Sequence, residues 1–489
     1  MSDPRWWKRA PVELWGLTTL AFATRFWRLS APGGRVWDEI YFQEYASRYF
    51  TGSYYFDVHP PLTKLLFALV ARLMRVPPEY FMNGTGITAF RVLPALTGAL
   101  LVPLVWWLVR ECGGTRRVAA FGAALVLMDN ALLVQSRLAL SDMPLLFFGI
   151  AAVTCLMAAR RMAGGARWAL LSLAALLGGC AAATKWTGLT ALGLIGATWL
   201  IDIATGLRRT AGDGGGVPAV GGAASARDAR RPVARWIGEG ALLLVLPAAV
   251  YFGSFVVHLR LLPNDGPGTG AMSRAFNETR RGHPAYTPDA KMGTVAQIAE
   301  IHRVAMETNL GWSTLQHVAA SKWYTWPVSK HRIMLWKDSL AAPGTEARMD
   351  IQGNPALWYG ILVAMGAFVV LLAMRRVEAR TLRAPMVWLG AAYVMNFVPF
   401  AFIARPMYLY HYNFALVFSI VLASLAMGAM CGWQKDDGAP WRLAAGARRW
   451  YLGTLLLVAV SFAYFAPLSY GTALSTAAAA QRRWVLERQ

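Results

Sequence analysis

Stretches of about twenty mostly apolar residues recur along this 489-residue chain. A helix needs roughly 20 such residues to cross the hydrocarbon core of a bilayer, where every backbone polar group must be paired within the protein. The stretches therefore predict an all-α polytopic membrane protein with about eleven transmembrane helices. They lie at residues 11–29, 88–109, 117–135, 143–160, 168–184, 187–206, 237–258, 355–374, 384–403, 412–432 and 450–468.

The composition excludes a soluble enzyme of this size. Hydrophobic residues make up 56% of the chain and charged residues only 15%, against about 25% charged residues in ordinary soluble domains. The 21 Trp, 17 Tyr and 22 Phe residues suit a protein with many membrane–water interfaces, where aromatic side chains gather.

The net charge of +22 is explained by membrane topology. Lys and Arg concentrate in alternate loops, whereas the intervening short loops carry only Arg137, Lys185 and Arg405. Cytoplasmic loops are the ones enriched in Lys and Arg, so we predict a cytoplasmic N-terminus and an extracytoplasmic C-terminus, and no nucleic acid as a partner. The basic clusters lie at 5–9, 110–117, 160–167, 208–235, 375–383 and 435–449.

The predicted domain organisation is a single multi-spanning unit with two long loops on the outer side. All seven His residues lie on or near that side, so we expect the chemistry to face outward. The four Cys residues form no CxxC pair and the His residues have no ligand spacing, so neither a disulfide framework nor a metal site is expected. The predicted parts are the transmembrane domain 1–470, the first loop 30–87, the cytoplasmic linker 207–236, the second loop 259–354 and the outer tail 471–489.

The first loop carries the strongest candidates for catalysis. Asp38 and Glu39 are adjacent just after a membrane helix; they form either a solvated charge pair or a general base whose pKa is raised by burial and by the neighbouring carboxylate. His59 precedes Pro60-Pro61 and is either structural or substrate-binding. The stretch Leu62–Met74 predicts an amphipathic helix on the outer leaflet, and we expect such helices in both long loops.

Four isolated cations reach the same outer leaflet. Each could be a snorkelling anchor, but together they suit the phosphate of a lipid-linked substrate, which Arg binds with a bidentate fork. They are Arg25, Arg137, Lys185 and Arg405. Asp129-Asn130, late in the third stretch, is expected to make a polar contact between helices. Trp323 and Tyr324 form either an interfacial belt or, with His411 of the RPMYLYHY segment, part of a substrate platform.

Seven segments, in order, resemble the protein O-mannosyltransferase family, a group of membrane glycosyltransferases of GT-C type. They are VWDEIYF, YYFDVHPPLTKLL, MDNALLVQSRLALSD, TKWTGL, SKWYTWP, GNPALWYG and RPMYLYHY, and they span about residues 25 to 415. The resemblance implies eleven spans and transfer of mannose, with inversion, from a polyprenyl monophosphate to Ser or Thr of secreted proteins. It also implies that Asp38 is the general base, that Glu39 binds the acceptor or orients the base, and that Arg25 and Arg137 lie near the carrier phosphate. The roles of Arg405 and His411 are left open.

The resemblance further implies the partners and the location. The lipid-linked donor takes the place of a cofactor, and the acceptor is a polypeptide that emerges from the secretion machinery. The second loop is too short for the β-trefoil module of eukaryotic members, which favours a bacterial form in the inner membrane with its active site outside. Two alternatives remain: a glycosyltransferase acting on a glycolipid such as lipid A, like an aminoarabinose transferase, and more remotely a transporter of lipid-linked sugar.

Overall fold

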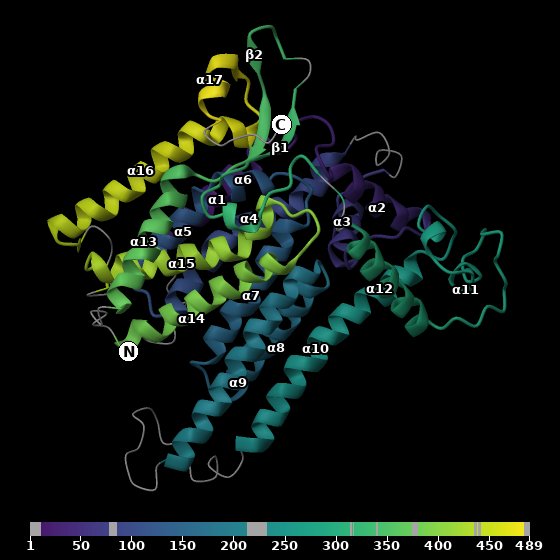
Figure 1. The fold of residues 1–489 in the computed structure, drawn as a ribbon, viewed down its shortest axis with the longest axis horizontal. Coiled ribbons are helices and arrows are strands. Elements are labelled where there is room, and N and C mark those ends of the chain that lie inside the picture. The colour runs from purple at the N-terminus through teal and green to yellow at the C-terminus, as the bar shows by residue number, and fades with distance from the viewer. Residues whose placement is uncertain are drawn as a thin grey trace.

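The computed structural model is a bundle of long helices that carries its loops and short strands at one side (Figure 1). It describes residues 11–77, 86–212, 232–312, 315, 317–338, 341–373, 380–434, 438 and 442–483. The α-helices are α1 (Val12–Phe26), α2 (Glu39–Thr51), α3 (Leu62–Leu73), α4 (Ile87–Glu111), α5 (Arg116–Leu127), α6 (Asn130–Gln135), α7 (Asp142–Ala159), α8 (Gly164–Ala182), α9 (Leu189–Gly212), α10 (Pro232–Leu261), α11 (Arg274–Asn277), α12 (Thr294–Gly311), α13 (Pro355–Ala373), α14 (Arg380–Phe397), α15 (Asn413–Met430), α16 (Ala445–Tyr470) and α17 (Thr476–Gln481).

The predicted polytopic helical fold is confirmed. Each apolar stretch falls on helix, and within the described residues eight helices are long and apolar enough to cross a membrane. The predicted number of eleven crossings stays a prediction, because three stretches fall short of that criterion. α1 has 15 residues, α13 counts as a shorter apolar helix over its described part Pro355–Val370, and the third stretch is divided into α5 and α6.

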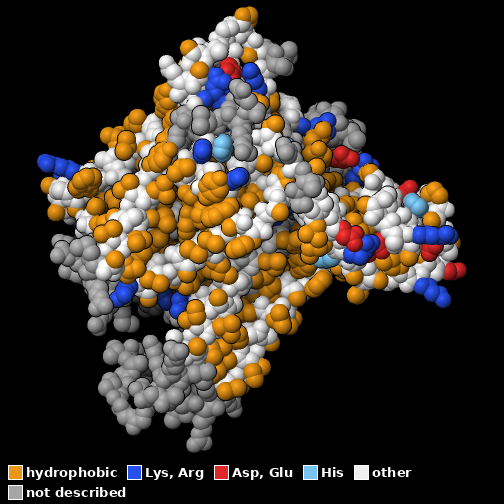
Figure 2. Space-filling model, in the orientation of Figure 1, with side chains coloured by type: hydrophobic (Ala, Val, Ile, Leu, Met, Phe, Trp, Pro, Cys, Tyr) orange, Lys and Arg blue, Asp and Glu red, His pale blue; other side chains and the backbone are white. Residues whose placement is uncertain are grey.

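The core lies where α4, α7 and α15 cross the centre of the bundle. Most side chains of these helices are buried, and α4 packs against α1, α5 and α7. The outer helices α10 and α16 instead expose apolar side chains such as Leu244 and Leu456. Figure 2 shows hydrophobic side chains covering the helical body, while charged ones gather toward its edges. Such a surface suits lipid contact.

The division between α5 and α6 has a specific cause at Asp129. Its backbone is extended, and its side chain accepts a hydrogen bond from the Leu132 N–H, so that it caps a new helix. The other carboxylate oxygen accepts a 2.6 Å hydrogen bond from Trp358 Nε1 on α13. Asn130 contacts Ser469 and the Phe462 carbonyl of α16. The predicted polar contact between helices is confirmed, and it coincides with a helix break.

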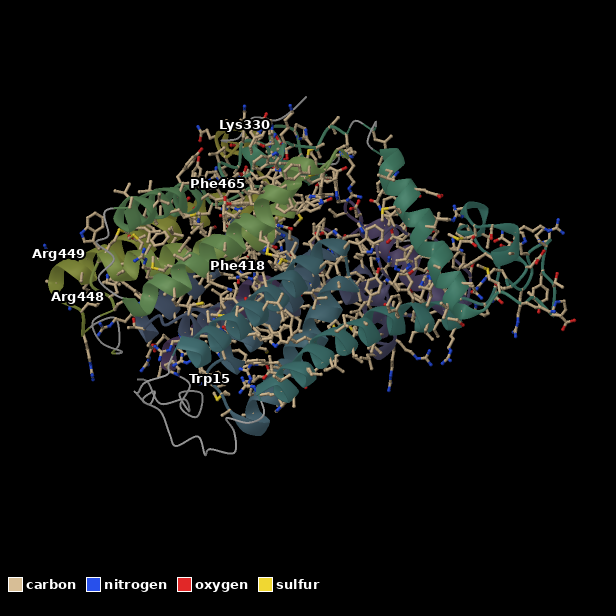
Figure 3. All side chains as sticks on the ribbon, turned by 60° about the horizontal axis from the view of Figure 1, so that its bottom comes forward. Trp15, Lys330, Phe418, Arg448, Arg449 and Phe465 are labelled. Atoms are coloured by element: carbon tan, nitrogen blue, oxygen red, sulfur yellow. The ribbon has the colours of Figure 1, made fainter. Side chains whose placement is uncertain are left out.

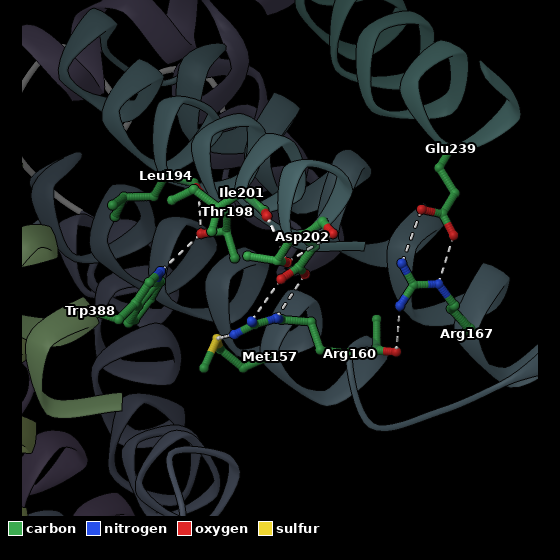
Figure 4. Close-up of polar contacts among 11 residues, drawn as sticks. Met157, Arg160, Arg167, Leu194, Thr198, Ile201, Asp202, Glu239 and Trp388 are labelled. Atoms are coloured by element: carbon green, nitrogen blue, oxygen red, sulfur yellow. Dashed lines mark hydrogen bonds and ion pairs between the residues drawn. The ribbon is translucent and has the colours of Figure 1, made fainter. Parts of the chain in front are cut away.

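Two ion pairs connect the helices α7, α8, α9 and α10 near their predicted cytoplasmic ends (Figure 4). Arg160 holds Asp202 of α9 at 2.8 Å, and Arg167 holds Glu239 of α10 at 2.6 Å. α9 continues to Gly212 and α10 begins at Pro232, so helix occupies both ends of the predicted linker 207–236. The middle of that linker, 213–231, lies outside the described residues, as do the predicted cytoplasmic residues 1–10.

The two long loops fold against the same side of the bundle. The first contains α2 and the amphipathic α3, which buries Lys64, Phe67 and Ala71 and exposes Leu69 and Leu73, as predicted. The second contains α11, α12, three strands and 3₁₀ turns. The 3₁₀ helices are η5 (Thr269–Ala271) and η7 (Trp323–Thr325) here, and η3 (Trp186–Gly188), η8 (Val398–Phe402) and η9 (Leu409–Tyr412) elsewhere.

The sequence analysis did not predict the short strands that accompany the helices of these loops. β1 (Ile333–Lys337) pairs antiparallel with β3 (Arg348–Ile351), with Ile333 opposite Ile351. β2 (Thr345–Glu346) pairs with β4 (Leu474–Ser475), so residues 471–483 of the predicted tail pack onto the second loop. A buried network of Arg332, Arg348 and Asp350 fixes the β1–β3 pair.

Candidate active site

Asp38 occupies the N-cap position of α2 without capping it. An Asp at this position ordinarily accepts a hydrogen bond from the first helical turn, but here its side chain makes no cap bond. The preceding Trp37 has a φ of 51°, in the left-handed region that costs a bulky residue about 1–2 kcal/mol. No described side chain or backbone group donates a hydrogen bond to the Asp38 carboxylate. The loop therefore holds an uncommitted carboxylate in a strained backbone.

Burial is the main influence on this carboxylate. It raises the pKa of Asp38 to about 6, and the charges of Asp142 and Asp57 act in the same direction. Lys185 and His317 oppose the shift, so both lie close enough to interact with Asp38 electrostatically. A carboxyl with such a pKa is mostly deprotonated at neutral pH, yet it is a stronger base than an ordinary carboxylate and is suited to accept a proton.

Glu39, the adjacent residue, has the opposite environment. Its carboxylate is fully buried and pairs with Arg91 of α4 through two bonds of 2.8 and 2.7 Å. It also accepts hydrogen bonds from the Val36 and Ala139 backbone N–H groups at 2.8 and 2.7 Å. All of its accepting capacity is used, so nothing remains for an acceptor substrate. The geometry supports the orienting role considered for Glu39 rather than a direct catalytic one.

Arg91 extends this anchor to the rest of the loop. Its guanidinium also donates to the carbonyls of Leu29, Pro32 and Gly34, at 3.2, 2.9 and 2.8 Å. The segment before Asp38 is thus fixed to α4 by one fully buried side chain. The sequence did not reveal this residue, because Arg91 stands inside an apolar stretch 52 positions from its partner.

A cavity of about 600 Å³ lies beside this loop and brings four of the predicted residues together. It is lined by His59, Lys185, Arg405 and His411, together with apolar side chains such as Met306 and Phe402. This volume is ordinary for a small-molecule site. Phe402 is 85% exposed, so the apolar mouth of the cavity faces outward from the protein.

The two cations of this cavity are held in different ways. Lys185 pairs with Asp142 at 2.8 Å and lies over the Tyr410 ring, 5.2 Å from its centroid. Arg405 donates to the Asn309 side chain and lies over Trp312, 5.7 Å from its centroid. Arg405 has no carboxylate partner among the described residues, so its charge is available to an anionic ligand.

The two histidines of the cavity differ: His59 is neutral, and His411 is held by contacts within the protein. Burial lowers the pKa of His59 to about 3, so this imidazole carries no charge at neutral pH. His411 accepts a hydrogen bond from the Tyr408 N–H at 3.1 Å and stacks on Trp326. Beside His59, the carboxylate of Asp57 pairs with Lys64. This ion pair joins the two sides of the Pro60-Pro61 segment.

A second cavity, of about 810 Å³, contains the predicted Trp323 and Tyr324. It is lined also by His317 and Lys322, and it shares Arg405 with the first cavity. The two cavities meet at the segment 400–407, which lines both of them. Trp37, next to Asp38, packs edge-on against His317 with ring centroids 5.8 Å apart. Asp38 is therefore close to groups of both cavities.

Arg25 and Arg137 lie away from these cavities. Arg25 donates to the carbonyls of Leu127 and Val126 at 3.0 and 3.1 Å. Arg137 donates to carbonyls at the end of α1, including Trp27 at 2.6 Å, and stacks on Tyr470. Both are at most 1% exposed. The structure thus does not join them to Lys185 and Arg405 in one phosphate site; they connect α1 to the α5–α6 break.

Sequence reasoning missed several partners of the predicted residues. Asp142 and Tyr410 lie at the same outer level as Lys185, and an acid opposite a lone membrane cation was a usable signal. Asn309 and His317 lie in the second loop, where no local motif distinguished them. Among the described residues no group of three or more His, Cys, Asp or Glu side chains could hold a metal ion.

This arrangement of membrane-length helices, an acidic first loop and two cavities beside it has the fold of the GT-C class of polytopic membrane proteins. The solved structure of the S. cerevisiae protein O-mannosyltransferase Pmt1-Pmt2 complex bound to the sugar donor has the same fold. It matches with a TM-score of 0.82 at 16% identity, covering 97% of this chain and 92% of that one. The oligosaccharyltransferase of Archaeoglobus fulgidus matches with a TM-score of 0.53 at 13% identity, covering 96% and 57%.

The chain belongs to the dolichyl-phosphate-mannose-protein mannosyltransferase family, whose sequence profile matches residues 15–263. The C-terminal four-transmembrane region of protein O-mannosyltransferase matches residues 294–488. Protein O-mannosyltransferase 1 of Drosophila pseudoobscura is 34% identical over 283 residues, covering 55% of this chain and 29% of the relative. Dolichyl-phosphate-mannose–protein mannosyltransferase 4 of Schizosaccharomyces pombe is 31% identical, covering 55% and 34%. The matched part spans about a third of the length of these relatives.

Proposed function

We propose that the protein transfers mannose from a polyprenyl monophosphate to Ser or Thr hydroxyls of proteins on the outer face of the membrane. The observation that carries the proposal is the uncommitted, half-buried carboxylate of Asp38, close to groups of two cavities. The family assignment supports the mannosyl donor. It disfavours the glycolipid-acceptor and transporter alternatives, and no feature of the described site supports either of them.

The smaller cavity suits the donor. Its apolar mouth can accept the first isoprenoid units, and Lys185 and Arg405 can hold the phosphate, since charge-assisted bonds to phosphate are strong in a partly dry site. His59 and His411 can offer hydrogen bonds to the sugar. Phosphate is already a good leaving group, so no general acid is needed.

The reaction is then a single displacement. The acceptor hydroxyl oxygen attacks C1 of mannose while its proton passes to Asp38. The bond between C1 and the phosphate oxygen breaks, and the electron pair leaves with the phosphate. Lys185 and Arg405 stabilise the negative charge that grows there. Attack opposite the leaving group inverts C1, and the single base distinguishes this site from the two-carboxylate sites of glycoside hydrolases.

The location follows from the same proposal. The charge distribution favours a cytoplasmic N-terminus, with loops 30–87 and 259–354 and the tail 471–489 outside. The short second loop favours a bacterial inner-membrane enzyme whose acceptor emerges from the secretion machinery. The relatives named above come from an animal and a yeast, so the bacterial setting rests on the sequence alone.

A transfer assay with the Asp38→Asn variant tests the function. Purified protein receives labelled polyprenyl-phosphate mannose and a Ser/Thr-rich peptide. We expect label on the peptide with the wild type and a rate about 10²–10⁴-fold lower with Asp38→Asn, the ordinary contribution of a general base. Asp289→Asn, at an exposed acid of the second loop, is the control and should keep the rate. Near-normal transfer by Asp38→Asn would remove the base assignment. Transfer of label to an added glycolipid, with none on the peptide, would indicate a glycolipid acceptor.

A further inference from the structure

The larger cavity has an unbalanced charge. His317, Lys322 and Arg405 line it, and none of its described lining residues is Asp or Glu. Lys322 is exposed and makes no ion pair with any described residue. His317 accepts a hydrogen bond from the Ala319 N–H on Nδ1, at 3.1 Å, so its neutral form carries the proton on Nε2 and can donate it. The cavity thus offers several donors to an anion.

The carrier phosphate does not need all of these donors. Lys185 lies only in the smaller cavity, and Arg405 lines both. The segment 400–407 lines both cavities, whereas His317 and Lys322 line only the larger one. We therefore expect His317 and Lys322 to contact a different ligand from the carrier phosphate that Lys185 binds.

The shape and chemistry of the larger cavity suit a peptide. Trp323 and the 58% exposed Tyr324 offer aromatic surfaces over which an extended chain can pack. His317 marks the end nearest Asp38, because its ring contacts Trp37, and it also contacts Tyr408 with centroids 5.4 Å apart. A hydroxyl at the His317 end would reach the base, leaving neighbouring residues of the peptide near Lys322.

We propose that the larger cavity is an acceptor-peptide site selective for segments that carry an acidic residue close to the target Ser or Thr. The inference rests on the transferase function proposed above. The acidic side chain pairs with Lys322, while the target hydroxyl lies at the His317 end, toward Asp38. A basic residue at the same place meets Lys322 as a like charge and is disfavoured.

Equilibrium binding of matched fluorescent peptides tests this selectivity without relying on catalysis. Full-length protein in nanodiscs of neutral lipid is titrated with peptides that differ only in Glu, Gln or Lys beside one Thr, with the substituted position scanned on both sides. We expect the Glu peptide to bind about two- to fivefold more tightly than the Gln peptide, the upper part of the range for an exposed charge pair. The preference should shrink in 0.5 M salt, since salt screens exposed charges.

Two variants of the same loop locate the effect. Lys322→Glu should reverse the order of the Glu and Lys peptides, whereas Lys330→Glu, at an exposed Lys outside the cavity lining, should leave it unchanged. Lys322→Gln should remove the preference for the Glu peptide and covers the case in which Lys322→Glu fails to fold. Equal affinity for the three peptides, or the same change with both Lys→Glu variants, would overturn the proposal.

Two further arms separate this inference from the proposed function. In the first, a short-chain polyprenyl phosphate competes with the bound peptides. If it displaces the Glu peptide but not the Gln peptide, the cations of the larger cavity bind the carrier, and the inference is overturned. Adding the mannosyl donor tests transfer on the same peptides. Selective binding of the Glu peptide without transfer to any peptide would contradict the mannosyl transfer and keep the acidic-peptide site.

Discussion

Asp38 and Glu39 are neighbours in the chain, yet their surroundings assign them different tasks. Glu39 is saturated by Arg91 and two backbone N–H groups, whereas Asp38 keeps its lone pairs and has its pKa raised mainly by burial. Two carboxyls with divergent environments are a common arrangement where one must act as a base. The sequence showed the adjacent pair, but it could not show which member was free.

The pKa of Asp38 predicts the pH dependence of transfer. A general base works only when deprotonated, so the rate should rise as pH increases through about 6 and level off above about 7. We expect kcat/KM for peptide to follow this curve, measured with the wild type in neutral lipid between pH 4.5 and 8.5. A rate that is flat or falls across this range would contradict the base role; stability over the same range serves as the control.

The buried pair of Glu39 and Arg91 predicts a strong energetic coupling. Removing one partner leaves a buried charge unpaired, which costs about 3–5 kcal/mol, and it also releases the loop that holds Asp38. Glu39→Gln and Arg91→Met should each lower the unfolding midpoint and the transfer rate, and the double variant should lose much less than the sum. Denaturation of all four proteins in detergent measures the coupling.

The exposed pair of Arg303 and Glu307 provides the matched control. Its closest contact is 2.8 Å and both side chains are more than half exposed, so a double-mutant cycle there should give a coupling of about 0.5 kcal/mol or less. A coupling at Glu39–Arg91 as small as this would contradict the anchoring role. Only the folded chain reveals this pair, because Arg91 lies inside a predicted transmembrane stretch.

At the scale of elements, the break between α5 and α6 shows what periodicity can and cannot predict. The apolar stretch 117–135 predicted one helix, and Asp129-Asn130 predicted a polar contact within it. The contact is present, but Asp129 also ends one helix and begins another. A hydropathy window does not detect such a break, because a short extended link changes neither the length nor the composition of the apolar stretch appreciably. The strands were missed for a related reason: two to five residues give too little alternation.

The cap at Asp129 predicts a measurable loss of stability. Asp129→Ala removes the cap of α6, which lowers the free energy of unfolding by about 1 kcal/mol. It also leaves the buried Trp358 N–H without its acceptor, which lowers it by about a further 1–3 kcal/mol. We expect faster thermal inactivation in detergent than for the wild type. Asp129→Ala in a Trp358→Phe background should cost only the cap. Asp289→Ala, at an exposed acid, should have no effect, and an equal loss there would contradict the explanation.

At the scale of the whole molecule, the polytopic helical class followed from length and hydropathy alone, because the bilayer demands long apolar helices. The cavities could not be predicted in this way. The walls of the smaller cavity come from η3, α12, η9 and the segment 400–407, and those of the larger cavity come from the segments 317–324 and 400–407. These parts are brought together from separate regions of the chain. The sequence placed Lys185, Arg405 and His411 at one face of the membrane; only the packing of the second loop shows that His59 joins them and that Arg25 and Arg137 do not.

The orientation of the molecule is the prediction on which the site's location depends. Figure 3 shows α16 running from Arg448 and Arg449 toward Phe465, with Lys330 at a distance from its start. Both Lys330 and Arg449 are exposed. If Lys and Arg mark the cytoplasmic loops, Arg449 lies inside the cell and Lys330 outside, on the side of both cavities.

Cysteine labelling distinguishes the two orientations. Lys330→Cys and Arg449→Cys are made in a background in which Cys112, Cys155, Cys180 and Cys431 are replaced by Ala. In intact spheroplasts a membrane-impermeant maleimide should label Cys at 330 and not at 449, and permeabilisation should make both reactive. The reverse pattern would place the cavities in the cytoplasm, where a secreted acceptor cannot reach Asp38. The transfer reaction would then need an internal acceptor, so this result would overturn the outer-face activity even if the isolated protein transferred mannose.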